Sequence, residues 1–120
     1  RITLAADSRG HFVSSGTING QVMQYMVDTG ASTVAIGRTD ADRMGLNYQS
    51  GQPVRVNTAN GVAQGWRMKI DSLRIGEVEV FGVDAIITPQ PMPYVLLGNS
   101  FLAGFQMTRI NDQMVLEKRH

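Results

Sequence analysis

Short apolar segments separated by turn-forming residues run along the whole chain. Two Asn-Gly pairs, Asn19-Gly20 and Asn60-Gly61, are the strongest of these turn signals, because the central residues of a tight hairpin adopt positive φ values that Asn and Gly tolerate. Each pair joins two apolar segments, and the second opens a long arm over residues 62–70. Short strands at this spacing predict an all-β domain.

Two short helices are expected within this β framework. The first covers residues 39–44, begins with a Thr followed three positions later by an Asp, as in a capping box, and stops at Gly45. The second covers residues 101–103, after Asn99 and Ser100, which are candidates for its cap. No low-complexity tract or linker separates these elements.

Composition limits the chemistry that the chain can perform. Its 120 residues fit one domain, residues 1–120, and its 11 basic and 10 acidic side chains give a net charge of +1 without a basic cluster. We therefore expect no nucleic-acid partner. With no Cys and only two His, the chain lacks the Cys and His ligands that usually form a metal site in a protein. We therefore expect no metal and no cofactor. Carboxylates, hydroxyls and backbone groups remain for chemistry.

The chain also lacks a membrane-spanning pattern. No apolar run approaches the roughly 18 residues that a bilayer requires, so we expect no membrane contact within these residues. The chain begins at Arg1 rather than Met. We expect a soluble domain that is processed or excised from a longer protein, and an upstream anchor stays open.

One segment combines an acid with a tight turn. Asp28-Thr29-Gly30-Ala31-Ser32 follows an apolar strand that would hold the carboxylate rigidly. Gly30 lets the backbone turn and bring amides close to that carboxylate, and Thr29 can lock the loop by hydrogen bonding. An Asp before Gly is also a common turn residue that satisfies local amides. The residues of this segment alone leave both interpretations open.

The segment resembles the active-site signature of the retropepsin-like aspartic proteases. Thr58-Ala59-Asn60-Gly61, about thirty residues later, resembles the flap hairpin of bacterial retropepsin-like proteins, and Leu96-Leu97-Gly98 with the short helix after it resembles the element that supports the catalytic loop. The order of these elements covers most of the chain. The resemblance implies an all-β, retropepsin-like closed barrel of the acid-protease type, with one or two short helices and one lobe per chain.

The same resemblance implies an aspartic endopeptidase. Aspartic proteolysis needs two carboxylates that share one proton, and this chain has a single Asp-Thr-Gly and room for one lobe. The second carboxylate would then come from Asp28 of an identical copy, in a homodimer that hydrolyses a peptide or protein substrate. The catalytic residues would be Asp28, Thr29 and Gly30. The substrate-binding residues would be Ala31, Ser32, Thr58, Ala59, Asn60, Gly61, Leu97 and Gly98.

This chain differs from the retroviral enzymes at two positions that bear on the dimer. Retroviral enzymes carry an Asp where this chain has Ser32, and that Asp pairs with an Arg where this chain has Asn99. Without this ion pair, we expect interface strands to come from the closing hairpin, residues 106–116.

Two other functions stay open. The chain could be a non-catalytic member of the same fold that binds peptides or serves in assembly, or a structural β module in which the Asp-Thr-Gly is accidental. The resemblance is also compatible with the periplasm-facing part of a membrane-anchored bacterial protein, although the residues themselves carry no cellular address.

Overall fold

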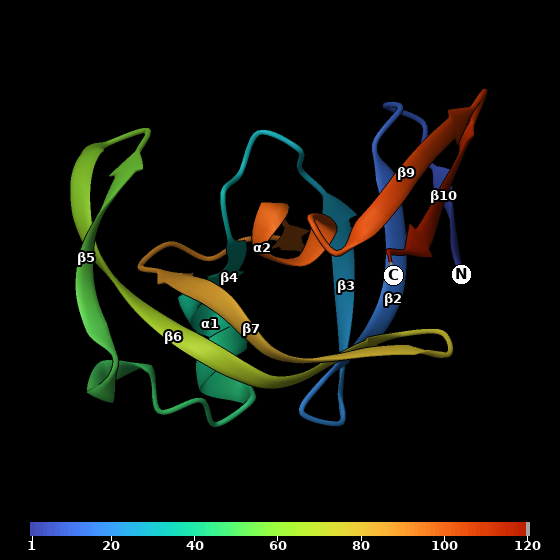
Figure 1. Cartoon of the computed structure of the whole chain (residues 1–120). Helices are drawn as coiled ribbons and strands as arrows, with labels where there is room; N and C mark the ends of the chain where they lie inside the picture. The colour runs from blue at the N-terminus through green and yellow to red at the C-terminus, as the bar shows by residue number, and fades with distance from the viewer. Residues whose placement is uncertain (120) are drawn as a thin grey trace.

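The computed structural model describes residues 1–119, which form ten β-strands, two short α-helices and one 3-10 turn (Figure 1). The strands are β1 (Ile2–Ala6), β2 (Phe12–Ile18), β3 (Gln21–Val27), β4 (Val34–Gly37), β5 (Gln52–Thr58), β6 (Gly61–Ile75), β7 (Val78–Thr88), β8 (Val95–Leu97), β9 (Phe105–Ile110) and β10 (Gln113–Lys118). The helical elements are α1 (Arg38–Arg43), η1 (Tyr48–Ser50) and α2 (Asn99–Leu102). The predicted all-β class with two short helices is confirmed.

Six of the strands close into a barrel. They follow the order β6-β7-β4-β8-β3-β2, and a further pairing between β2 and β6 joins the two ends. In that last pairing Ile18 lies opposite Leu73. Gly16 lets β6 pass this close, because a Cβ added there would overlap the carbonyl oxygen of Arg74. The predicted closed barrel with one lobe per chain is therefore confirmed.

The turn between β2 and β3 stabilises the pairing of β2 with β6 that closes the barrel. Asn19 has φ 49° and Gly20 has φ 82°, the positive values that the Asn-Gly pair predicts. The backbone N–H of Asn19 donates to the carbonyl of Ser72 at 2.9 Å, and the Asn19 side-chain oxygen accepts the Ser72 N–H at 3.0 Å. This turn thus forms the hairpin and also ties it to β6.

The barrel interior is filled by apolar side chains from alternate strand positions. Along β7, Val83, Ala85 and Ile87 point inward and are buried, while the residues between them are partly exposed. Each large apolar side chain buried in this way contributes about 1.5–3 kcal/mol. Tyr25 is the largest fully buried side chain, and its hydroxyl donates to the carbonyl of Thr17 at 2.7 Å. Burial raises the pKa of Tyr25.

Four strands extend from the ring on its two sides. On one side β5 pairs with the first half of β6 in a long hairpin that curves away from the barrel (Figure 1). On the other side β1, β10 and β9 continue the sheet from β2, so that β9 is its outer edge. Residues 106–110 of β9 are exposed.

Both helices lie near the predicted positions, but the predicted caps are wrong. The N-cap of α1 is Gly37, so Thr39 lies inside the helix and makes no capping hydrogen bond. The N-cap of α2 is Gly98, so Asn99 and Ser100 also lie inside their helix. The physical reason at α2 is that both side chains bind segments remote in sequence, as described below. Within residues 1–119, neither helix has the length and apolar character to cross a membrane.

Candidate active site

Asp28 stands where β3 ends, at the opening of a loop that leads to β4. β3 is flanked by β2 on one side and by β8 on the other, with Val27 opposite Leu97. The backbone N–H of Asp28 donates to the carbonyl of Leu97 at 3.1 Å. Asp28 is half-buried, and its carboxylate accepts the N–H of Gly30 at 3.0 Å. The barrel therefore fixes the backbone of Asp28, and the turn orients its carboxylate.

The first turn of α2 holds the loop that follows Asp28. The backbone N–H groups of Asn99 and Ser100 donate to the carbonyls of Ala31 and Ser32, at 2.8 and 3.0 Å. The Asn99 side chain also donates to the carbonyl of Thr29 at 3.3 Å. Three carbonyls of one short loop are thus bound to one short helix.

Gly98 makes this close contact possible. A Cβ at this position would overlap the carbonyl of Thr33 and would lie 2.8 Å from the carbonyl oxygen of Ala31. Any other residue would push α2 away from the loop. Leu97 and Gly98 are both buried beneath the loop, so they support it from below, whereas Ala31 is half-buried.

The loop tip faces away from the barrel. Thr29, Gly30 and Ser32 are exposed. In Figure 1 the loop between β3 and β4 extends to the same side of the molecule as the tips of the β5–β6 and β9–β10 hairpins. The sequence-predicted catalytic residues therefore lie at an open face between two hairpins.

The β5–β6 hairpin turns one residue earlier than the Asn-Gly pair predicts. Thr58 pairs with Gly61, so Ala59 and Asn60 are the central residues. Of these four residues only Gly61 has a positive φ, 105°, which suits a type I turn followed by a glycine bulge. The reason is local: the Thr58 hydroxyl donates to the Gly61 carbonyl at 2.7 Å and accepts the Asn60 N–H at 3.2 Å.

A hollow of about 340 Å³ lies between this hairpin and the barrel. Its floor includes Ala35 of β4 and Leu96 of β8, and a wall is formed by the loop after β7. Its lining residues are Ala35, Val56, Asn57, Thr58, Ala59, Thr88, Gln90, Met92 and Leu96. The hollow thus gathers Thr58 and Ala59 with residues that sequence reasoning missed. Residues from separate segments give no sequence signal of their own until the fold is known.

A second hollow, of about 320 Å³, lies beside the loop that follows Asp28, against β9. It is lined by Gly10, His11, Phe12, Val27, Thr29, Met107, Arg109 and Met114. The Arg109 guanidinium lies over the Phe12 ring, 5.1 Å from its centroid. Beside it, the Asp7 carboxylate accepts the backbone N–H of His11, which lowers the pKa of Asp7. Thr29 therefore borders a surface shared with the edge strand.

Metal ligands do not gather anywhere in residues 1–119, where no three His, Asp or Glu side chains are grouped so as to hold an ion. Buried polar side-chain atoms of the same residues all have hydrogen-bond partners.

Comparisons with known proteins agree with this architecture. The family described as "gag-polyprotein putative aspartyl protease" matches residues 14–104. A retropepsin-like aspartic protease from Rickettsia conorii, known from a crystal structure, superposes with a TM-score of 0.82 at 29% sequence identity, covering 96% of this chain and 88% of that one.

Two further relatives are described as uncharacterized. One, in the cobV 5′ region of a Sinorhizobium species, is 33% identical over 103 residues, which are 84% of this chain and 44% of that protein. The other, from Rickettsia prowazekii, is 29% identical over 116 residues, or 96% and 50% of the two chains. The chain thus spans about half the length of these relatives. With its family match over residues 14–104, the chain belongs to the gag-polyprotein aspartyl protease family and has a retropepsin-like fold.

Proposed function

We propose that this chain is one half of an aspartic endopeptidase, whose active site forms when Asp28 meets Asp28 of an identical copy. The observation that carries the proposal is the placement of the Asp28 carboxylate. It accepts the Gly30 N–H, and the loop that carries it is bound to α2 and has an exposed tip. The chain has one Asp-Thr-Gly, and the reaction needs two carboxylates. A second copy supplies the other.

The chemistry follows from two carboxyl groups that share a proton. Like charges at about 3 Å cannot both ionise, so one group keeps the proton while the other is a base. The base removes a proton from water, whose oxygen attacks the peptide carbonyl carbon. The carbonyl oxygen takes the proton of the acid, which gives a tetrahedral diol. The C–N bond then breaks as the carboxyl group that took the proton from water protonates the nitrogen and the other, now ionised, carboxylate removes a proton from a diol hydroxyl, so that a carboxylic acid and an amine leave and the pair again shares one proton. No metal or cofactor takes part in this scheme.

The second copy would dock where β9 and the loop share a surface. β9 is a sheet edge with unpaired backbone groups along its outer side. Met107 and Ile110 are among the few large apolar side chains exposed in residues 1–119, and Met107 lines the hollow that Thr29 borders. Contact along this face would bring the loops of two copies together and would use the closing hairpin expected from the sequence.

The peptide would lie beneath the β5–β6 hairpin in an extended conformation. The 340 Å³ hollow offers apolar groups from Ala35, Val56, Met92 and Leu96, which suits an apolar substrate side chain. Extended peptides pair with strand edges by backbone hydrogen bonds, and alternate side chains enter pockets. Thr58, Ala59, Asn60 and Gly61 form the hairpin tip, where Thr58 is half-buried and the other three are exposed. This tip would close over the peptide and exclude water.

Digestion of a peptide library across a range of pH, with the wild-type chain and the Asp28→Asn variant, tests the proposal. The wild type should cleave and Asp28→Asn should lose cleavage while keeping its thermal stability, because the amide preserves the shape of the loop but cannot serve as a base. Asp71→Asn is the matched control, since Asp71 is an exposed acid on β6, and it should cleave like the wild type.

Two results would refute the assignment. The first is undiminished cleavage by Asp28→Asn, which would mean that another group does the chemistry. The second is a wild-type chain that binds peptides without cleaving any of them at any pH. That second result would favour a non-catalytic peptide-binding domain of the same fold.

A further inference from the structure

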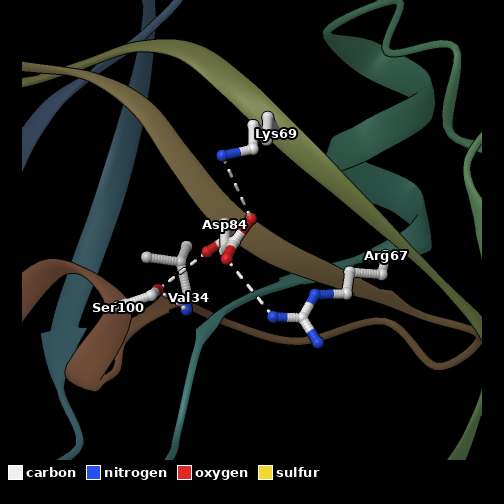
Figure 2. A network of polar contacts seen from close by, with 5 residues as sticks. All are labelled: Val34, Arg67, Lys69, Asp84 and Ser100. Atoms are coloured by element: carbon white, nitrogen blue, oxygen red, sulfur yellow. Dashed lines mark hydrogen bonds and ion pairs between the residues drawn. The ribbon is translucent and has the colours of Figure 1, made fainter.

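The hydroxyl of Ser100 joins three elements at a single point. It donates to the backbone carbonyl of Asp84 on β7 at 2.7 Å and accepts the backbone N–H of Val34 on β4 at 2.9 Å (Figure 2). Val34 is the first residue of β4 and lies opposite Ala85, the residue after Asp84. Ser100 therefore bridges β4 and β7 where their parallel pairing begins, immediately after the loop that carries Asp28.

The backbone of Ser100 binds the loop that precedes β4. The Ser100 N–H donates to the carbonyl of Ser32 at 3.0 Å, beside the bond from Asn99 to Ala31. The loop is thus bound through its carbonyls by the backbone of α2. The strand that leaves the loop is bound by the Ser100 side chain.

We infer that Ser100 is a positioning residue for Asp28, an inference that rests on the proposed protease function. Its hydroxyl fixes α2 against β4 and β7, and α2 in turn fixes the loop that orients the carboxylate. A reacting group must be held to within a fraction of an ångström for efficient chemistry. A group that is both donor and acceptor is needed here, and a hydroxyl supplies both.

The Asp84 carboxylate does not carry this link. Figure 2 shows it directed toward two basic side chains of β6, Arg67 at 3.2 Å and Lys69 at 3.9 Å. These groups are partly or largely exposed, and exposed ion pairs contribute little. Ser100 instead uses the backbone carbonyl of Asp84, which any residue at this position provides.

Three substitutions at Ser100 test the inference, with kcat and KM measured on a peptide that the wild type cleaves. Ser100→Ala and Ser100→Cys should each lower kcat about tenfold, because loss of the partly buried hydrogen bonds of the Ser100 hydroxyl loosens the loop, while KM stays within about twofold. Ser100→Thr keeps the hydroxyl and should restore most of the kcat. If Ser100→Ala does not fold, the comparison of Cys with Thr decides, since Cys fills the same space with a weak hydrogen-bonding group.

Ser72→Ala is the matched control. The Ser72 hydroxyl donates to the Glu79 carboxylate at 2.6 Å, between β6 and β7 and away from the loop, so its loss should leave kcat unchanged. A kcat within twofold of wild type for both Ser100→Ala and Ser100→Cys would overturn the inference. So would an equal loss in Ser100→Thr or in Ser72→Ala, because either would indicate a general effect of substitution.

Amide hydrogen exchange measured by NMR provides a readout that needs no activity. The Val34 amide should exchange at least tenfold faster in Ser100→Ala than in wild type, and unchanged exchange would overturn the inference. If the wild type cleaves no peptide, or if Asp28→Asn cleaves normally, the proposed function fails instead, and exchange at Val34 still tests the Ser100 contact by itself.

Discussion

The loop at Asp28 and the tip of the β5–β6 hairpin face the same side of the molecule but are held in opposite ways (Figure 1). The loop is bound by Asn99 and Ser100, and the bond from Asn99 to Thr29 spans 70 positions of the chain. The side-chain bonds at the hairpin tip link residues no more than three positions apart, from Thr58 to Gly61 and Asn60.

This difference has a consequence for motion. Bonds between remote segments tie the loop to the whole barrel, so the loop can rearrange only if the barrel does. Because the bonds at the tip are local, we expect the tip to move as a unit without opening the barrel. In the proposed function, a fixed acid beside a movable cover would allow a peptide to enter and would then exclude water from it.

The largest expected effect comes from breaking the loop's support. Gly98→Ala would drive a Cβ into the Thr33 carbonyl, so we expect the free energy of unfolding to fall by about 3 kcal/mol or more. Gly104→Ala is the control, because its added Cβ would meet no atom closer than 3.6 Å. Urea denaturation of both variants measures the difference in the free energy of unfolding. Equal values would show that α2 and the loop can move apart with little loss of stability.

The next effect concerns the tip. Gly61 has φ 105°, so Gly61→Ala should strain the turn by about 1–2 kcal/mol and lower kcat/KM several-fold while the barrel stays folded. Gly20→Ala places similar strain, at φ 82°, in the β2–β3 hairpin and should leave kcat/KM unchanged. Peptide cleavage rates of the two variants make the comparison. Equal rates in Gly61→Ala and wild type would remove the hairpin tip from the proposed mechanism.

The smallest effect should come from Asp84. Asp84→Asn weakens its ion pairs with Arg67 and Lys69, which should reduce stability by at most about 1 kcal/mol and leave kcat unchanged, because Ser100 binds the backbone carbonyl. Thermal unfolding and steady-state kinetics check both values. A tenfold loss of kcat would show that the carboxylate, rather than the carbonyl, supports the loop.

The elements that the sequence predicts well are those with local causes. Asn19-Gly20 forms its turn because both residues adopt positive φ. The closed barrel, by contrast, is predicted through the resemblance of the Asp28 loop, the hairpin and Gly98 to the retropepsin-like proteases. The turn predicted at Asn60-Gly61 lies one residue earlier, because the neighbouring Thr58 hydroxyl forms hydrogen bonds with the Gly61 carbonyl and the Asn60 N–H. A dipeptide signal does not include such a neighbour.

The features that the sequence does not reveal depend on remote contacts. The sequence predicts Ser100 only as a candidate cap, yet its hydroxyl binds Val34, 66 positions away, and Asp84, 16 positions away. The apolar hollow likewise joins Ala35, Met92 and Leu96 from separate segments. No local pattern connects these residues, because only closure of the barrel brings them together.

Mixing the wild-type chain with Asp28→Asn tests the central proposal, that two copies each supply one Asp28. A ninefold excess of Asp28→Asn added to a fixed amount of wild type, with time for subunits to exchange, should reduce total cleavage about tenfold, because most wild-type chains would then pair with an inactive partner. Asp71→Asn in the same excess should cause no such loss. Cleavage that is unchanged by the excess of Asp28→Asn would show that one chain works alone and would contradict the shared site.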